Sequence, residues 1–268
     1  MRMSSFSIFV FLLFSAAFSI QEVTAQQRNS TISLNSTLSP NTSWLSSSGR
    51  FAFGFYQEGD GFSVGIWLTT NPEKTVIWAA NRDNPKVSSN VGLIFTSGGL
   101  ILTPAQGENI TISLHNKLAS SASMQDSGNF VIYDSDSKII WQSFESPTNT
   151  LLPGQRFLPG MEMYSSASEA DHSNGRFLLI MQLDGYLVQY PALAPYTITF
   201  GYWDSGPGSA GANATLILDN DGKLYLHNST SIAKTLSESK GNGMTYRLTV
   251  DVDGFFRLYS HPFTRNEN

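Results

Sequence analysis

Ser127-Gly128-Asn129-Phe130 is one of six places where a Ser-Gly or Asp-Gly pair leads into an alternating apolar stretch. Glycine adopts a positive φ without a Cβ clash, and the preceding Ser or Asp can hydrogen-bond to nearby backbone, so each pair predicts a hairpin turn followed by a strand. Three turns in each half of the chain predict two all-β domains, each with pseudo-threefold symmetry. The other five turns are Ser48-Gly49-Arg50-Phe51, Ser97-Gly98-Gly99-Leu100, Asp184-Gly185-Tyr186-Leu187, Asp221-Gly222-Lys223-Leu224 and Asp253-Gly254-Phe255-Phe256.

The rest of the chain also reads as β structure. Short apolar runs bounded by Gly, Pro, Asn and Asp predict strands throughout, and helical periodicity is almost absent. The polar stretches 162–175, 204–213 and 237–243 are expected to be loops. The Pro153-Gly154 turn predicts the junction between a first domain at 26–150 and a second at 151–268.

The N-terminus has the features of an export signal. Arg2 precedes an apolar run from Phe6 to Ile20, and Val23-Thr24-Ala25 supplies small residues for cleavage. These features predict a signal peptide at 1–25, because the apolar run is too short to favour a membrane anchor. We therefore expect a secreted, extracellular protein of the apoplast or cell wall, with no membrane association once the signal peptide is removed.

Composition narrows the classes of partner. A net charge of −5 argues against nucleic acid, and 14% charged residues leave solubility to Ser, Thr, Asn, Gln and attached sugars. Cysteine is absent, which excludes disulfides, thiol catalysis and Cys-ligated zinc. We expect no cofactor and no metal site. Six Asn-x-Ser/Thr sequons predict N-glycosylation at Asn29, Asn35, Asn41, Asn109, Asn213 and Asn228.

One strand carries a row of groups suited to a sugar. Side chains alternate between the faces of an extended strand, so five residues share one face: Gln125, Ser127, Asn129, Val131 and Tyr133. The row combines hydrogen-bonding groups with an apolar surface, which is the mixture that a sugar needs. An amphipathic strand with an exposed polar face explains the same pattern.

The spacing of this row resembles the Gln-x-Asp-x-Asn-x-Val-x-Tyr mannose site of monocot bulb-type lectins. Trp78-Ala-Ala-Asn-Arg-Asp-Asn-Pro85 and the longer stretch from Trp141 to Gln155 resemble the ectodomain of plant G-type lectin (S-domain) receptor-like kinases. This resemblance implies two tandem β-prisms, each built from three four-stranded sheets with one site per sheet. It also implies mannose-type glycans as ligands and a role in recognition or plant defence.

The rows depart from the family pattern in different ways. Ser127 stands at the family's Asp position, and Asp126 is expected on the opposite face, so a weakened sugar site is predicted. A second candidate row keeps four of the five family positions, with Tyr186 in place of Asn. We rank the first row above the second and expect the hairpins at 97–103, 219–227 and 251–259 to be structural. The second row is Gln182, Asp184, Tyr186, Val188 and Tyr190.

Other readings of the chain are less favoured. The turn acids Asp184, Asp221 and Asp253 could form a glycosidase pair, but each precedes Gly as turn residues do, and kinase motifs are absent, so we expect no enzyme. Trp203 and the other four tryptophans could stack on sugars, although core packing is their usual role. The main alternative to sugar binding is a protein-interaction module that pairs with full-length receptor-like kinases.

Overall fold

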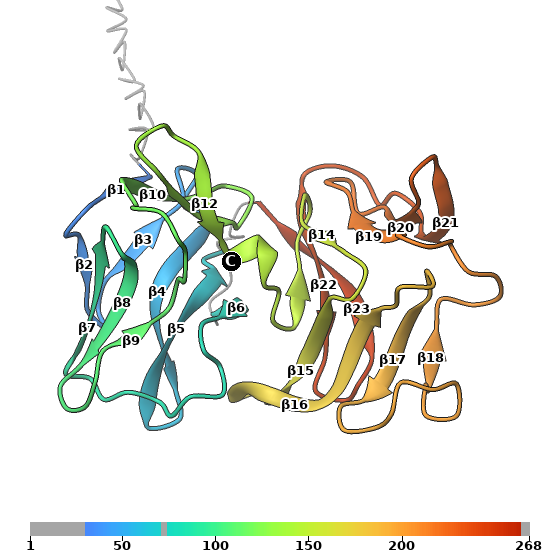
Figure 1. The fold of residues 1–268 in the computed structure, drawn as a ribbon, viewed down its shortest axis with the longest axis horizontal. Coiled ribbons are helices and arrows are strands. Elements are labelled where there is room, and N and C mark those ends of the chain that lie inside the picture. The colour runs from blue at the N-terminus through green and yellow to red at the C-terminus, as the bar shows by residue number, and fades with distance from the viewer. Residues whose placement is uncertain (1–29, 71–73, 264–268) are drawn as a thin grey trace, which may run out of the picture.

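The computed structural model describes residues 30–70 and 74–263, so the expected signal peptide at 1–25 lies outside the described residues. The described chain is all-β, as predicted, and its single helical element is the short 3-10 helix η1 (Ser143–Glu145). The sheets fall into two groups, formed by strands β1–β12 and β13–β23, which we call the first unit and the second unit. The two units lie side by side (Figure 1).

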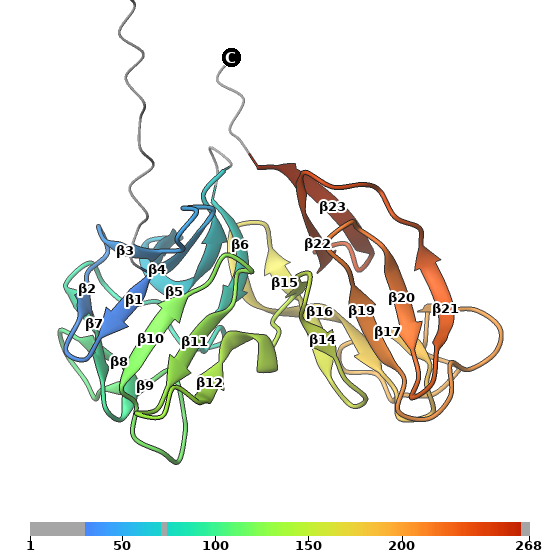
Figure 2. The ribbon, with the colours of Figure 1, turned by 90° about the horizontal axis from the view of Figure 1, so that it is seen from above.

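The first unit consists of three antiparallel sheets of four strands each, arranged around one core (Figure 2). In two of the sheets a short early strand pairs with a hairpin that follows much later in the chain, whereas the third sheet is formed by four consecutive strands. The sheets, in pairing order, are β1 (Thr31–Ser33), β10 (Ser121–Met124), β11 (Phe130–Tyr133), β12 (Ile139–Gln142); β2 (Thr37–Leu38), β7 (Val91–Thr96), β8 (Gly99–Pro104), β9 (Ile110–Thr111); and β3 (Ser43–Leu45), β4 (Phe51–Glu58), β5 (Gly61–Leu68), β6 (Thr75–Ala79).

The second unit repeats this plan with one difference. Two of its sheets have four strands, but the third has only three among the described residues, where four were expected; residues beyond 263 lie outside that range. The sheets, in pairing order, are β15 (Glu162–Ser168), β16 (Asp171–Met181), β17 (Leu187–Pro191), β18 (Trp203–Asp204); β14 (Arg156–Phe157), β19 (Thr215–Leu218), β20 (Leu224–His227), β21 (Ile232–Ser237); and β13 (Thr150–Leu151), β22 (Met244–Val250), β23 (Phe256–Pro262).

Glycine sets the turns largely as the sequence predicts. Gly128 and Gly185 have φ values of 87° and 90°, in the left-handed region. At the Ser97-Gly98-Gly99 turn the prediction is off by one residue, because the positive φ of 111° belongs to Gly99. Thr96 pairs directly with Gly99, so this hairpin has a two-residue turn rather than the longer turn found at Gly128.

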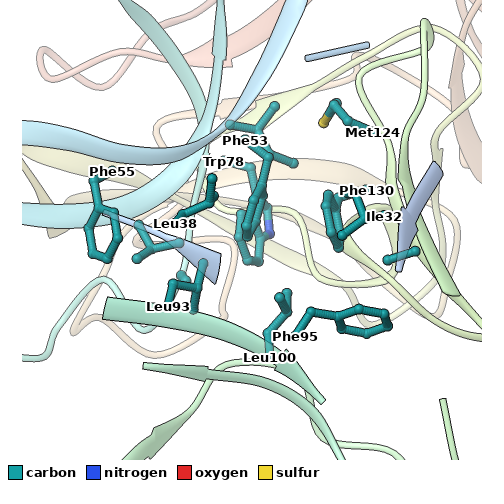
Figure 3. Close-up of a cluster of buried hydrophobic side chains, with 14 of the residues drawn as sticks. Ile32, Leu38, Phe53, Phe55, Trp78, Leu93, Phe95, Leu100, Met124 and Phe130 are labelled. Atoms are coloured by element: carbon teal, nitrogen blue, oxygen red, sulfur yellow. The ribbon is translucent and has the colours of Figure 1, made fainter. Parts of the chain in front are cut away.

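Aromatic side chains fill the core of the first unit (Figure 3). Phe53 and Phe130 come from different sheets, are fully buried, and stack with their ring centroids 4.2 Å apart. Trp44 stacks on both rings, with its centroid 5.7 Å from that of Phe53 and 6.0 Å from that of Phe130. Such ring pairs add about 0.5–1.5 kcal/mol to the stabilisation that burial of their area gives, so these contacts join two of the three sheets.

The core of the second unit is mainly aliphatic, and the two cores meet at the junction. Leu151 packs in the second core, whereas its neighbour Leu152 packs in the first. Consecutive side chains on an extended segment point in opposite directions, so these two neighbouring leucines can each pack into a different core. The predicted boundary between 150 and 151 falls within β13.

The stretch 162–175 was predicted to be a loop, and this prediction is wrong. The segment forms most of the β15–β16 hairpin, with Ser166 opposite Asn174 and Ser168 opposite Asp171. The hairpin end extends towards the first unit (Figure 1), whose polar groups contact its polar face, so alternation with apolar residues is not required. The predicted loops 204–213 and 237–243 are irregular except for their first residues, which end β18 and β21.

A single arginine of the first unit fixes this hairpin. The Arg82 guanidinium donates from Nη1 to the carbonyl of Tyr164 at 3.1 Å, and from Nη2 to the carbonyls of Ser165 and Ser173, both at 3.1 Å. Its Nε donates to the carbonyl of His172. Planar guanidinium groups present several donors in a fixed geometry, so Arg82 satisfies four backbone carbonyls where the units meet.

Glu58 forms a second link beside Arg82. Its side chain is buried and pairs with the Lys86 ammonium at 2.8 Å, accepts from Ser63 Oγ at 2.6 Å, and lies 3.1 Å from His172 Nδ1. Burial acts to raise the pKa of the Glu58 carboxyl, but the hydrogen bonds from Lys86, Ser63 and the His172 backbone outweigh it and hold the pKa below its ordinary value.

Candidate functional site

The row predicted in the first unit begins at the turn before β11 and continues along that strand. Gln125 Nε2 donates to the Tyr133 hydroxyl at 3.0 Å, and Ser127 Oγ donates to Gln125 Oε1 at 3.3 Å. These three side chains therefore lie on a common face, as predicted, and the turn at Gly128 brings Gln125 within reach of Tyr133.

Asn129 and Val131, in the middle of this row, are buried, with exposed fractions of 5% and 0%. Asn129 Nδ2 donates to Gln142 Oε1 at 2.8 Å, and its Oδ1 accepts from Ser143 Oγ and from the Phe144 backbone N–H, both at 3.2 Å. Gln142 is paired with Val131 across the sheet. The Gln142 side chain, which reaches Asn129 from that position, therefore covers this part of the row. The polar atoms of Asn129 are thus used to hold η1 against β11.

Asp126 faces away from the row, as expected. Its Oδ1 accepts hydrogen bonds from the Ser48 backbone N–H at 2.8 Å and from Ser48 Oγ at 2.5 Å. Burial acts to raise the pKa of this carboxyl, but the bonds from Ser48 lower it more, so the pKa lies below its ordinary value. Asp126 therefore joins two of the hairpin turns and takes no part in the row.

The second predicted row has a different environment. Gln182, Asp184, Tyr186, Val188 and Tyr190 all line one pocket with a volume of about 610 Å³. Gln182 Nε2 donates to the Tyr190 hydroxyl at 3.0 Å, which repeats the amide–phenol bond of the first row at the same eight-residue separation. The two rows therefore share an internal geometry, but in the second the row faces an open cavity.

A long loop forms the opposite wall of this pocket. The connection between β17 and β18 runs over residues 192–202, whereas the corresponding connection between β11 and β12 occupies only residues 134–138. The greater length of this loop is visible in the sequence, and it is the signal that could have led us to rank the second row above the first. The loop and the residues after it line the pocket with Tyr196, Ile198, Gly201, Trp203, Asp204, Gly206 and Pro207.

Tyrosine hydroxyl groups hold the loop in place. Tyr196 donates to Glu162 Oε1 at 2.7 Å and its ring lies 5.2 Å from that of Tyr190, while Tyr202 donates to the Gly254 carbonyl at 2.6 Å. Burial and the bond to Glu162 raise the pKa of Tyr196, and burial, together with a nearby Asp, raises the pKa of Tyr202 to about 12. Both phenols thus stay protonated as donors, which keeps the wall of the pocket ordered.

Four residues of the 251–259 row, Asp251, Asp253, Arg257 and Tyr259, line a pocket of about 430 Å³, but their polar groups bond to one another. Arg257 bonds both oxygens of Asp253, at 2.8 and 2.7 Å, and also Asp251 Oδ2 at 2.6 Å. The Tyr259 hydroxyl donates to the same Asp251 oxygen at 2.7 Å. Every polar group of the row is engaged within the hairpin, in agreement with the expectation of a structural role.

The rows of the other two hairpins are also engaged by contacts within the fold. In the hairpin at 219–227 the Tyr225 hydroxyl donates to Asp219 Oδ1 at 3.3 Å, and the Lys223 ammonium lies 5.6 Å from the Tyr225 ring. In the hairpin at 97–103, Phe95 stands at the position of the family's Gln and is fully buried in the core. Among the described hairpins, the row at 182–190 is therefore the one whose five residues all line a pocket and whose acidic turn residue has no cationic partner.

The two signature stretches at 78–85 and 141–155 serve structure. Trp78 Nε1 donates to the Ser146 carbonyl at 2.9 Å, and its ring meets the Trp141 ring edge-on at 6.0 Å. Gln155 Nε2 donates to the Phe144 carbonyl at 3.0 Å, where the chain passes from one unit to the other. Together with Arg82, these contacts hold the junction, so the most specific sequence signatures of the chain belong to its scaffold.

The predicted glycosylation positions lie mostly on the surface. Asn35, Asn41, Asn109 and Asn213 are exposed, and Asn29 falls outside the described residues. Asn228 is half-buried, and its Nδ2, the atom that would carry a glycan, lies 3.4 Å from the Ala210 carbonyl. Its Oδ1 caps the turn that follows, through the backbone N–H groups of 230 and 231. Asn228 is therefore the least accessible of the described positions.

Within residues 30–70 and 74–263, no helix has the length and apolar character needed to cross a membrane.

Comparison with known proteins shows which proteins the chain is similar to. A family model described as D-mannose binding lectin matches residues 75–169. The G-type lectin S-receptor-like serine/threonine-protein kinase LECRK1 of Oryza sativa subsp. japonica is 34% identical, over 95% of this chain and 34% of the kinase. The corresponding kinase RLK1 of Arabidopsis thaliana is 33% identical, over 69% of this chain and 24% of the kinase. The chain thus spans about a third of the length of the first relative and less of the second.

Solved lectins also match part of the chain. The mannose-specific agglutinin from snowdrop (Galanthus nivalis) bulbs, complexed with methyl-α-D-mannoside, is 22% identical, over 41% of this chain and 88% of its own, with a TM-score of 0.33. With its sheets, its rows and its receptor-kinase relatives taken together, the chain belongs to the family of bulb-type (G-type) lectins.

Proposed function

We propose that this protein binds carbohydrate without transforming it, and that its sugar site is the pocket formed by the 182–190 row and the 192–207 segment. The observation that carries the proposal is that all five row residues line a single pocket of about 610 Å³. Both rows contain two buried residues, but in the first row the polar atoms of Asn129 are used by Gln142, Ser143 and Phe144. The geometry therefore favours the second row over the first, which reverses the ranking suggested by sequence.

The pocket offers the contacts that a pyranose ring requires. Gln182 uses its Nε2 on Tyr190, which leaves Gln182 Oε1 as an acceptor and the Tyr190 hydroxyl proton as a donor. The carboxylate of Asp184 can accept charge-assisted bonds from sugar hydroxyls. The ring of Tyr186, which replaces the family's Asn, offers an apolar face for sugar C–H groups. Mannose-type glycans are the first ligands to test.

A matched pair of substitutions tests this assignment. Gln182→Ala and Gln125→Ala each remove an amide that bonds a tyrosine hydroxyl at 3.0 Å, one in each row. Retention on immobilised mannose and titration calorimetry with mannose oligosaccharides are expected to show a loss of about tenfold or more for Gln182→Ala only. A loss for Gln125→Ala alone would move the site to the first row, and equal losses would assign binding to both rows. No retention of the unsubstituted protein on any glycan would end the proposal.

We also propose that the protein is exported and glycosylated. The predicted signal peptide at 1–25 supports export, and the exposure of four sequon asparagines supports glycosylation. Sequencing of the secreted protein should find the N-terminus at Gln26, and glycosidase treatment should lower its mass. An intracellular, sugar-free product would contradict both proposals.

A second function is favoured by a specific surface. Leu193 and Ile198 on the loop beside the pocket are almost completely exposed, with fractions of 101% and 96%. Exposed apolar groups of this kind occur where proteins dock, so the loop supports pairing with receptor-like kinase ectodomains. Co-purification with such an ectodomain, lost in Leu193→Ser with Ile198→Ser, would support it. Sugar binding should survive the Leu193→Ser change, because Leu193 does not line the pocket.

A further inference from the structure

The pocket at 182–190 carries unneutralised negative charge. Of its twelve lining residues, Asp184 and Asp204 are acidic and none is Lys, Arg or His. Each carboxylate uses Oδ1 to accept a backbone N–H, that of Tyr186 at 3.2 Å and that of Gly206 at 2.6 Å. Neither forms an ion pair within the described part of the chain. Both carboxylates therefore keep an oxygen for a ligand.

The hairpin at 251–259 shows what normally fills this position. Counting from the turn glycines, Asp184, Tyr186 and Val188 correspond to Asp253, Phe255 and Arg257. The Arg257 guanidinium bonds both oxygens of Asp253 and lies 5.2 Å from the Phe255 ring. A cation supplied by the chain thus lies between the turn carboxylate and the aromatic ring.

The hairpin at 219–227 has a similar arrangement. Lys223 follows the turn acid Asp221, and its ammonium lies 5.6 Å from the Tyr225 ring. Both sister hairpins of the second unit therefore have an acid, an aromatic ring and a cation of their own. The 182–190 hairpin has the acid and the rings, but Tyr186 and Val188 stand where the sisters have Lys223 and Arg257.

Aromatic side chains make the pocket suitable for a cation from outside. Tyr186, Tyr190, Tyr196 and Trp203 all line it, and the rings of Tyr190 and Tyr196 lie 5.2 Å apart. The faces of tyrosine and tryptophan rings attract ammonium groups by about 0.5–2 kcal/mol, and more strongly when water is excluded. Rings and carboxylates together favour a ligand that has both an apolar face and a positive charge.

The ammonium group of Lys234 lies at the edge of this pocket, which limits how much of the pocket's negative charge it can neutralise. Its ammonium donates to the Pro207 carbonyl at 3.1 Å, at the rim, and it has no ion pair with Asp204. It therefore leaves the inner carboxylate, Asp184, unpaired and weakens the negative potential only at the edge.

We propose that this pocket selects sugars that carry a protonated amine, the 2-amino-2-deoxyhexoses, over neutral sugars. The proposal rests on the sugar site proposed above. The ammonium group of the sugar would take the role that Arg257 has beside Asp253, near Asp184 and Asp204, with the sugar ring against the tyrosines. An N-acetylated amine has no charge, so acetylation removes the favoured contact.

Calorimetry with three oligosaccharides tests the proposal: a glucosamine tetramer, its fully N-acetylated form and a mannose tetramer. At a pH that protonates the amine, the glucosamine tetramer should bind about tenfold or more tightly than the other two, and added salt should reduce the difference. Raising the pH until the amine loses its proton should remove the preference.

Variants locate the charge. Asp184→Asn and Asp204→Asn are expected to abolish the preference for the amine, whereas Lys234→Gln should increase it. Asp221→Asn is the matched control, because this turn acid also accepts a backbone N–H two residues later but lies outside the pocket. Equal affinity for the amine and its N-acetylated form would overturn this inference and leave the proposed sugar site standing. Absence of binding to all three sugars would overturn both.

Discussion

Replacing Arg82 by methionine removes the guanidinium that joins the two units while keeping most of the side-chain stem. In the protein this group donates to the carbonyls of Tyr164, Ser165, His172 and Ser173. All four lie on the β15–β16 hairpin, which has no regular strand partner in the first unit. The substitution therefore leaves the hairpin end without its main attachment.

The expected loss follows from the number of bonds. A hydrogen bond contributes about 1 kcal/mol net, and more when the donor is charged, so four carbonyl contacts correspond to about 4 kcal/mol. In a protein of this size 1 kcal/mol shifts the melting temperature by about 2–4 °C, which gives a decrease of about 8–16 °C. Water that hydrates the four released carbonyls would make the loss of stability smaller. The decrease in melting temperature would then lie at the lower end of its range.

Differential scanning calorimetry measures the shift, and hydrogen exchange locates it. Arg176→Met is the matched control, because Arg176 is exposed on the same hairpin and its side chain forms no hydrogen bond or ion pair within the described residues. Amide exchange in residues 164–174 should become faster in Arg82→Met only. Equal melting temperatures for the two variants would refute the role assigned to Arg82.

Three further predictions follow from the contacts. Gly185→Ala would make the new Cβ clash with the Gly211 carbonyl oxygen. Gly243→Ala is the control, because Gly243 has a similar left-handed φ but no neighbour within 4 Å. Urea unfolding should show a clearly larger loss of unfolding free energy for Gly185→Ala. The folded-state pKa of Glu58 lies below its ordinary value of 4.5. The Glu58 carboxylate therefore stabilises the protein above pH 4.5, and this stability is lost as the pH falls through the lowered pKa. In urea titrations, Glu58→Gln should be less stable at neutral pH and its stability should depend less on acid pH. Bonds from Arg257 lower the pKa of Asp253 to about 2, and an NMR titration of Arg257→Met should return it towards 3.8.

Much of the fold was accessible from sequence because its signals are local. A Ser-Gly or Asp-Gly pair fixes a turn through the backbone freedom of glycine, and five of the six predicted positions carry the positive φ that this requires. Alternation then assigns the faces of the strands. The bond between Gln125 and Tyr133 also needs the predicted turn at Gly128, because eight residues of unbroken strand would separate them by about 26 Å.

The polar hairpin was missed for the opposite reason. Residues 162–175 have no apolar alternation, because one face of this hairpin packs against Arg82 and other polar groups of a distant segment. A sequence pattern reports burial against apolar partners and is silent when the partner is polar. The same applies to Glu58, whose burial depends on Lys86 and on the His172 backbone more than one hundred residues away.

By itself, the sequence determined the all-β class, the six turns and the rows of side chains along their strands, since these depend on backbone preferences and on the two-residue period. Only the tertiary structure decided which row is open. Asn129 bonds to residues of η1, whereas the loop at 192–202 forms one wall of a cavity beside β17. Whether a strand face is covered depends on where the next segment packs, and that is settled by contacts between residues far apart in the chain.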